Sequence, residues 1–214
     1  KKMTKPQIIE FFTRLRNQAP EPTSDLEWTN AYTLLVAVTL SAQATDVGVN
    51  KATKSLFEIV DTPQKMIDLG IDELKNHIKT IGLYNSKAKN VMAAAEILVN
   101  QHDGIVPDTR EELMALPGVG RKTANLVVIA GYNKPGICVD THVHRISNRF
   151  GYVKTKNADK TEMALRKTLP PDLWMDINRL LVTLGQNICH PTSPKCSICV
   201  IHDLCPRIGV TRSR

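Results

Sequence analysis

The sequence lacks the features of a membrane-spanning or secreted protein. None of its apolar runs reaches the length that spans a bilayer, and hydrophobic residues make up an ordinary 42% of its 214 residues. Nothing at its start resembles a secretory signal, so an oxidising compartment is unsupported. It also has no internal repeat and no low-complexity linker. We therefore expect a soluble globular protein with one large domain or two small ones.

Acidic residues are scarce relative to basic ones. The chain has 28 Lys and Arg against 21 Asp and Glu, which gives a formal net charge of +7 and a pI of about 9.2. This excess favours a polyanionic partner, because phosphates that are neutralised by cations release their condensed counterions. Charge alone is weak evidence for nucleic-acid binding, so this prediction depends on the sequence motifs.

Strand signals are absent as well, because the sequence has no pair of alternating segments and no hairpin turn. Nearly every segment instead has the apolar spacing of a helix. The expected helices include residues 6–17, 31–40, 122–130 and 173–187. Further helix starts are expected at Ser86, Thr109 and Asp159. The predicted fold class is all-α.

Two proline-containing breaks are the best candidates for domain boundaries. One is Pro20-Glu21-Pro22, and the other is the turn at residues 133–136. They predict a central helical block of residues 24–134, and a second block built from residues 1–23 plus 135–214.

Four of the five cysteines lie close together near the C-terminus. Cys189, Cys196, Cys199 and Cys205 have the spacing C-x6-C-x2-C-x5-C in a proline-rich segment. Four thiolates suit either a tetrahedral zinc ion or an iron–sulfur cluster, and the spacing does not separate the two. Disulfides are the alternative, disfavoured without an oxidising compartment. Cys138 lies in an apolar run and is expected to be a buried small side chain.

A glycine-rich turn separates two helical patterns at residues 116–124, Leu-Pro-Gly-Val-Gly-Arg-Lys-Thr-Ala. Its glycines allow a tight turn with positive φ. A helix N-terminus that follows such a turn presents backbone N–H groups, which favour an anion such as a DNA phosphate. We therefore predict that Gly118, Val119, Gly120 and Thr123 contact DNA.

Two side chains near this turn could carry chemistry. Lys122 lies just past it, and a neutral lysine amine can attack an electrophilic carbon to form a Schiff base, although most lysines are only solvated. Asp140 follows the apolar run 136–139 and is either a catalytic carboxylate or, more commonly at such a position, a helix N-cap. His142 and His144 have no third ligand nearby in the sequence, so we assign them structural roles.

These motifs occur in one order together with the segments 40–46 and 81–88. In this combination the chain resembles the helix-hairpin-helix DNA glycosylase superfamily, and most closely the endonuclease III family, over nearly its whole length. The resemblance implies two helical domains with a DNA-binding cleft between them. A six-helix domain would carry the hairpin. The second domain would hold a [4Fe–4S] cluster on the four C-terminal cysteines.

The resemblance also implies roles for single residues. Lys122 matches the nucleophile that attacks C1′ of the damaged nucleotide. Asp140 matches the carboxylate that assists this lysine and stabilises the cationic sugar. Gln43 and Leu83 match the residues that fill the gap and wedge the base stack after the nucleotide flips out. Lys195 lies between the cysteines, where we expect it to help the cluster loop bind DNA.

The function that the resemblance implies is a bifunctional DNA N-glycosylase and AP lyase of base excision repair. It would act as a monomer on double-stranded DNA, removing oxidised pyrimidines such as thymine glycol and cleaving at abasic sites. It would work at the nucleoid in the cytoplasm of a prokaryote or in the nucleus of a eukaryote. Adenine- and thymine-mismatch glycosylases are the first alternative, although they generally lack a lysine at the position of Lys122. A non-catalytic DNA-binding protein would need neither Lys122 nor Asp140, and a zinc-binding structural protein is a remote third.

Overall fold

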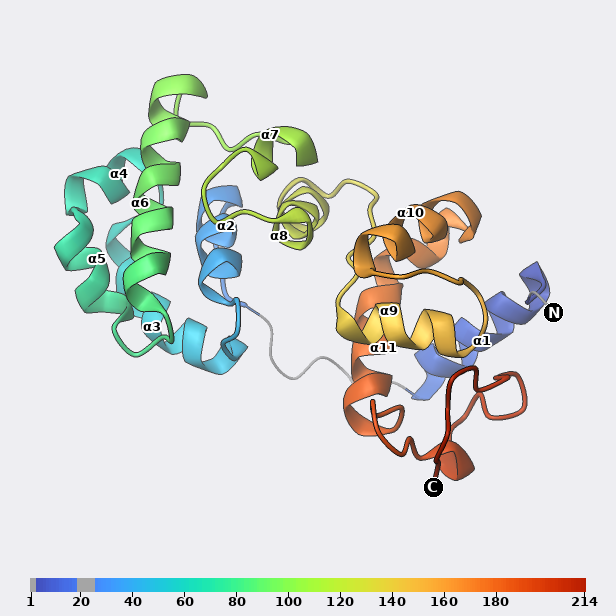
Figure 1. The fold of residues 1–214 in the computed structure, drawn as a ribbon. Helices are drawn as coiled ribbons and strands as arrows, with labels where there is room; N and C mark the ends of the chain where they lie inside the picture. The colour runs from blue at the N-terminus through green and yellow to red at the C-terminus, as the bar shows by residue number, and fades with distance from the viewer. Residues whose placement is uncertain (1–2, 19–25) are drawn as a thin grey trace. The chain divides into compact units, whose positions relative to one another are not determined.

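The computed structural model describes residues 3–18 and 26–214. Over these residues the chain forms helices and no strands, which confirms the predicted all-α class (Figure 1). The chain divides into two compact units: unit 1 contains residues 1–21 and 135–214, and unit 2 contains residues 22–134. The expected break at Pro20-Glu21-Pro22 lies outside the described residues. No helix in the described ranges is long and apolar enough to cross a bilayer.

Unit 2 is built around a central buried helix. Its elements are α2 (Ala31–Leu40), α3 (Asp46–Ile59), α4 (Pro63–Leu69), α5 (Ile71–Ile78), α6 (Tyr84–Gln101), α7 (Arg110–Met114), α8 (Arg121–Leu126) and the π-helical η1 (Val127–Gly131). Helix α2 is apolar on every face and almost wholly buried, as a helix inside a bundle must be. It packs against α3, α6 and α8. Helix α2 therefore supports both the long helix α6 and the helix that follows the glycine-rich turn.

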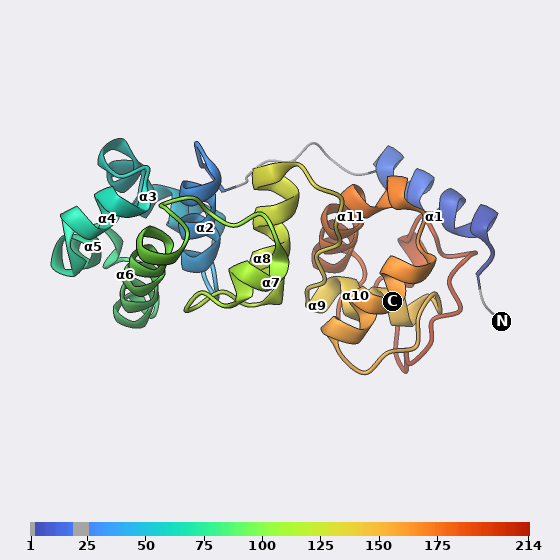
Figure 2. The same ribbon diagram turned by 90° about the horizontal axis from the view of Figure 1, so that it is seen from above.

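Unit 1 joins the N-terminal helix to the C-terminal half of the chain. Its elements are α1 (Lys5–Gln18), α9 (Thr141–Arg149), α10 (Ala158–Thr168), α11 (Trp174–Asn187) and the short 3-10 helices η2 (Pro171–Leu173) and η3 (Cys196–Ile198). Helix α1 packs against α11 (Figure 2). It buries Phe11, whose ring lies 4.2 Å from that of Phe150. The segment after α11 carries the clustered cysteines.

Capping residues explain where the helices begin, and two expected caps are corrected. Thr109 accepts from the Glu112 N–H, as predicted. Ser86 is not a cap, because α6 begins two residues earlier and the Ser86 hydroxyl donates back to the Leu83 carbonyl. Asn157, rather than Asp159, is the N-cap of α10. Its backbone is extended and its side chain accepts from the Lys160 N–H, as is usual for asparagine at an N-cap.

Candidate functional site

The turn between α7 and α8 has the sharp geometry expected of it, but only one of its glycines needs positive φ. Gly118 has φ of +77°, whereas Gly120 has φ of −91°. A Cβ at position 118 would lie 2.9 Å from Cβ of Asn90, so α6 also requires glycine there. Gly120 is the N-cap of α8 and has no side chain to satisfy the first N–H groups of that helix.

Val119 lies in the middle of this turn, and its side chain packs into the protein. Its side chain is only 7% exposed, and its N–H donates to the Leu116 carbonyl at 3.2 Å. Val119 therefore anchors the turn in the core of unit 2. Its neighbours Gly118 and Gly120 are exposed, and Thr123 is half-buried.

Lys122 is the second residue of α8, and its side chain is exposed. The buried Ala124 and Asn125 hold the next turn of the helix against the core. From Val127 to Gly131 the helix widens into a π-helix, so the α-helix predicted to reach residue 130 ends at Leu126. Such π-turns are frequent near functional sites. The lysine thus stands on a short, firmly anchored helix directly after the hairpin turn.

Asp140 is the N-cap of α9, as the commoner of its two interpretations predicts. Its Oδ1 accepts from the Val143 N–H at 2.9 Å. The preceding residues 137–139 are buried, and Cys138 among them is the small core side chain that was expected. His144 Nδ1 lies 2.7 Å from Thr161 Oγ1, and His142 Nδ1 lies 2.9 Å from Arg145 Nη2. Both imidazoles therefore have hydrogen-bond partners within unit 1, which agrees with structural roles.

Gln43 and Leu83 share an unusual backbone conformation. Gln43 has φ of +56° and Leu83 has φ of +61°. Positive φ is uncommon for residues other than glycine, and for a bulky leucine it is a genuine outlier. Both side chains are nevertheless exposed, with Leu83 at 63%. Strained residues that present their side chains to solvent are typical of binding surfaces.

Sequence reasoning missed Lys87, a buried cation of unit 2. Its Nζ donates to the carbonyls of Leu40 at 2.9 Å and Ala42 at 2.7 Å. Desolvation by burial lowers the pKa of this amine. The available signal was a lysine inside the apolar stripe of α6, next to Ala88 and one turn before Val91.

The four clustered cysteines line one small cavity in unit 1, of about 30 Å³. Ile146, Phe150, Leu184 and Ile201 contribute apolar side chains to its walls. No disulfide joins the cysteines, and burial raises the pKa of the Cys205 thiol to about 11. Four soft donors around one apolar space fit an iron–sulfur cluster. Within residues 3–18 and 26–214, no group of His, Cys, Asp and Glu side chains has the arrangement that holds a single metal ion.

Helix α9 holds the first part of this cysteine loop. Arg149 Nη1 donates to Cys189 Sγ at 3.1 Å and to the His190 carbonyl at 2.8 Å. Arg145 Nη2 donates to the Cys189 carbonyl at 2.8 Å. Since Asp140 starts the same helix, α9 joins the capping carboxylate to the cysteine loop within unit 1.

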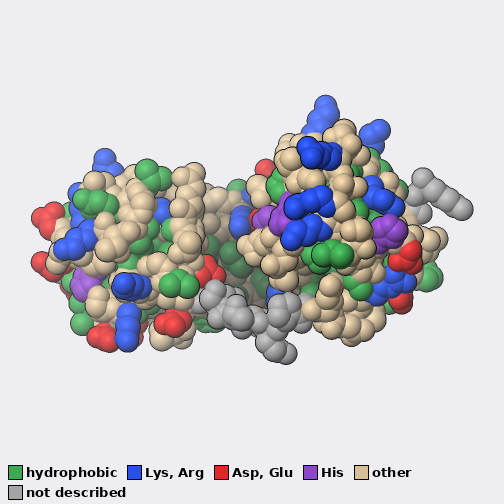
Figure 3. Space-filling view, turned by 90° about the horizontal axis from the view of Figure 1, so that it is seen from below, with side chains coloured by type: hydrophobic (Ala, Val, Ile, Leu, Met, Phe, Trp, Pro, Cys, Tyr) green, Lys and Arg blue, Asp and Glu red, His purple; other side chains and the backbone are tan. Residues whose placement is uncertain are grey.

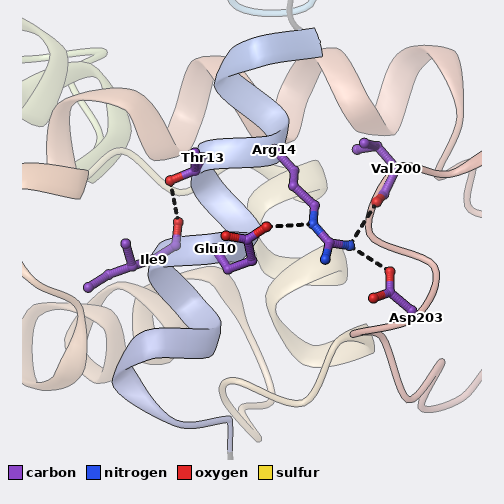
Figure 4. A network of polar contacts seen from close by, with 6 residues as sticks. All are labelled: Ile9, Glu10, Thr13, Arg14, Val200 and Asp203. Carbon is purple, nitrogen blue, oxygen red and sulfur yellow. Dashed lines mark hydrogen bonds and ion pairs between the residues drawn. The ribbon is translucent and has the colours of Figure 1, made fainter.

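Helix α1 holds the later part of the loop through Arg14 (Figure 4). The Arg14 guanidinium donates to the Val200 carbonyl at 3.2 Å and to Asp203 Oδ1 at 2.6 Å. This ion pair lowers the pKa of Asp203. Lys195 lines the cysteine cavity, and its N–H donates to the Ile188 carbonyl. On the surface of unit 1, Lys and Arg side chains gather on the face seen in Figure 3.

Comparisons with known proteins agree with this description. Residues 36–171 match the family model described as HhH-GPD superfamily base excision DNA repair protein, and residues 189–205 match the iron-sulfur binding domain of endonuclease III. The endonuclease III of Haemophilus influenzae is 48% identical over 203 residues, covering 95% of this chain and 96% of the relative. That of Escherichia coli K12 is 46% identical over the same shares of both chains.

Among solved structures, the chain is similar to a trapped covalent intermediate of endonuclease III with DNA. The TM-score is 0.85 at 40% identity, over 95% of this chain and 96% of that chain. The cofactor is a [4Fe–4S] cluster, and the protein binds DNA. The chain therefore belongs to the endonuclease III family, the iron–sulfur DNA glycosylases and AP lyases of base excision repair.

Proposed function

We propose that this enzyme removes oxidised or ring-saturated pyrimidines, including thymine glycol, from double-stranded DNA and then cleaves the strand at the resulting abasic site. The observation that carries the proposal is the exposed Lys122 amine placed directly after the hairpin turn. It is supported by the 40% identity to an endonuclease III that was trapped covalently on DNA.

Lys122 is proposed as the nucleophile for both steps. Its neutral amine attacks C1′, the glycosidic bond breaks, and the base leaves with the bonding electrons and takes up a proton. Opening of the sugar ring then gives an iminium between C1′ and Nζ. The iminium makes the C2′ proton acidic, so its removal expels the 3′ phosphate by β-elimination. One amine therefore accounts for glycosylase and lyase activity together.

Asp140 is proposed as the carboxylate that assists the lysine and stabilises the cationic sugar. Its Oδ1 is held by the Val143 N–H, which fixes the side chain relative to α9. A carboxylate fixed in this way provides negative charge without having to reorganise during the reaction.

The remaining proposed roles concern DNA binding. Gln43 fills the gap left by the flipped nucleotide, and Leu83 wedges the stack, roles that suit their exposed side chains. Gly118, Val119, Gly120 and Thr123 are proposed to contact DNA at a phosphate. Lys195 is proposed to bring a positive charge to DNA near the cysteine loop.

Cys189, Cys196, Cys199 and Cys205 are proposed as the cluster ligands. When bound, the cluster supplies iron that cross-links the loop through thiolates. The chain's own contribution is the apolar cavity and the arginine contacts that hold the loop. We also propose that the enzyme acts as a monomer, and in the cytoplasm at the nucleoid, since the relatives reported above are bacterial.

Borohydride trapping on a duplex that carries thymine glycol tests the reaction. The unaltered protein should give a covalent DNA adduct, and Lys122→Ala should give none while still binding the duplex. Lys65→Ala is the matched control, because Lys65 is an exposed lysine on α4 of unit 2, where it pairs with Asp61. It should trap normally.

The other outcomes separate the alternatives. Base release without any adduct would mean a monofunctional glycosylase, in which Asp140 activates water. Release of the base from adenine or thymine mismatches, in place of thymine glycol, would mean that the protein is a mismatch glycosylase. Binding with neither release nor adduct would leave only a DNA-binding role.

A further inference from the structure

Lys87 is a charged side chain where a hydrophobic one would be expected. It is only 6% exposed, on the face of α6 that also buries Ala88, Val91 and Ala94. Burying an ammonium group costs free energy unless it is hydrogen-bonded, so a lysine at this position needs partners. Its two carbonyl acceptors meet this need.

The first acceptor lies at the end of α2. Leu40 is the last residue of that helix, and its carbonyl belongs to the final turn, where no intrahelical donor is available. A cation is also favourable at the negative end of a helix dipole. Lys87 therefore fixes the point at which the chain leaves α2 for the turn that contains Gln43.

The second acceptor lies next to Gln43 itself. The Ala42 carbonyl is part of the peptide unit that joins Ala42 to Gln43. A donor 2.7 Å from this oxygen fixes the plane of that peptide unit, and the φ angle of Gln43 is a rotation relative to that plane. The bond therefore acts directly on the strained residue.

The same lysine contacts Leu83 through its backbone. The Lys87 N–H donates to the Leu83 carbonyl at 3.0 Å, which closes the first turn of α6. Leu83 and Gln43 lie forty residues apart in the sequence, and both have positive φ. Such strain persists only where the surroundings determine the conformation, and Lys87 bonds to the peptide units of both segments.

We propose that Lys87 is a positioning residue that fixes Gln43 and Leu83 relative to each other, and so couples the two side chains that replace a flipped nucleotide. This inference rests on the proposed roles of Gln43 and Leu83 in DNA binding. It extends them by naming the group that sets their spacing. Lys87 touches no DNA and no reacting atom in this role.

The test compares Lys87→Met with the unaltered protein. Methionine keeps an unbranched side chain and removes the donor. Affinity is measured for a duplex with a tetrahydrofuran abasic analogue and for the same duplex undamaged. Single-turnover base release from thymine glycol should fall by about a hundredfold, the loss that a misplacement of about 1 Å causes. Discrimination between the two duplexes should fall as well, while affinity for undamaged DNA stays unchanged.

Lys89→Met is the matched control, since Lys89 is an exposed lysine two residues further along α6. Its discrimination should equal that of the unaltered protein. Lys87→Arg retains a buried cation and donors, and it should recover part of the lost discrimination. If Lys87→Met does not fold, Lys87→Arg is compared with the unaltered protein in the same measurements.

A second experiment distinguishes positioning by Lys87 from a purely structural role of that residue. It repeats the Lys87 substitution in a protein that lacks the Gln43 and Leu83 side chains. In a Gln43→Ala, Leu83→Ala protein, Lys87→Met should cause no further loss of discrimination, because the side chains it positions are gone. An additional loss there, or equal loss of affinity for both duplexes, would overturn the inference. If Gln43→Ala and Leu83→Ala change nothing by themselves, their proposed DNA roles fail, and the inference about Lys87 fails with them.

Discussion

The Oδ1 atom of Asp140 accepts a hydrogen bond from the Val143 N–H at 2.9 Å, so the proposed catalytic carboxylate is also the cap of α9. Removing the side chain therefore mixes two effects. Asparagine caps a helix about as well as aspartate but carries no charge. It can separate the carboxylate's part in catalysis from its part in folding.

We expect Asp140→Asn to keep the stability of the unaltered protein. Asp140→Ala should lower the free energy of unfolding by about 1 kcal/mol, the usual value of an N-cap. Both variants should lose base-release activity, by roughly 10²- to 10⁴-fold for a positioned acid–base group. Urea unfolding and single-turnover kinetics measure the two effects. An active Asp140→Asn would mean that the hydrogen bond, and not the charge, is what the enzyme needs.

The hairpin offers a matched pair of glycine substitutions. Gly118→Ala places a methyl group on a residue with φ of +77° and 2.9 Å from Cβ of Asn90, which cannot swing aside. It should lower the free energy of unfolding by about 1–3 kcal/mol, the cost of a strained backbone. Thermal unfolding of the cluster-loaded protein measures it.

Gly120→Ala is the control for that stability loss. Its φ of −91° suits alanine, and nothing lies within 4 Å of the added Cβ. Its stability should stay close to that of the unaltered protein, while its affinity for DNA falls if a phosphate approaches this backbone. Equal destabilisation by both substitutions would show that neither φ nor Asn90 limits position 118.

Local patterns predicted the parts of the molecule that depend on neighbours in sequence. The apolar stripe of α1, the all-round apolar α2 and the cap at Asp140 follow from spacing within a few residues. The acceptors of Lys87 could not be found in this way, because they lie 45 and 47 residues away. The positive φ of Leu83 is likewise a tertiary property, since leucine itself disfavours it. The contact of Arg149 with Cys189 spans 40 residues and belongs to the same class.

The pH dependence of unit 2 should include a contribution from Asp108. Lys134 Nζ lies 3.0 Å from Asp108 Oδ2, and this hydrogen-bonded ion pair lowers the pKa of the carboxyl. A lowered folded-state pKa stabilises the fold above the carboxyl's unfolded pKa, and this stabilisation disappears as the pH falls through the lowered value.

The difference in stability between the unaltered protein and Asp108→Asn should therefore be present in full at pH 6, begin to fall near about pH 4, the ordinary range of an aspartate, and be smallest at the most acidic pH at which the protein still folds. Because the pair is exposed, we expect the difference to be small. Urea unfolding at the two pH values measures it. A difference that is the same at both would assign it to packing rather than to charge.

The last prediction concerns how the protein holds its cluster loop. Arg149 donates to Cys189 Sγ, to the His190 carbonyl and to the Pro191 carbonyl, so one planar guanidinium secures three consecutive residues. Arg149→Met should lose its cluster to an iron chelator faster than the unaltered protein does. The decay of the cluster's visible absorbance measures this rate. Arg149→Lys keeps the charge but offers only a point donor, so its loss should be intermediate.

Arg179→Met is the control, because Arg179 is an exposed arginine that forms a surface ion pair with Asp176 at 3.7 Å, and such pairs contribute about 0–1 kcal/mol. Its cluster should be lost at the rate of the unaltered protein. Since α9 carries both Arg149 and Asp140, Arg149→Met should also lower base release in proportion to the fraction of protein that has lost its cluster. Full activity in cluster-depleted Arg149→Met would show that the loop and the N-cap of α9 act independently.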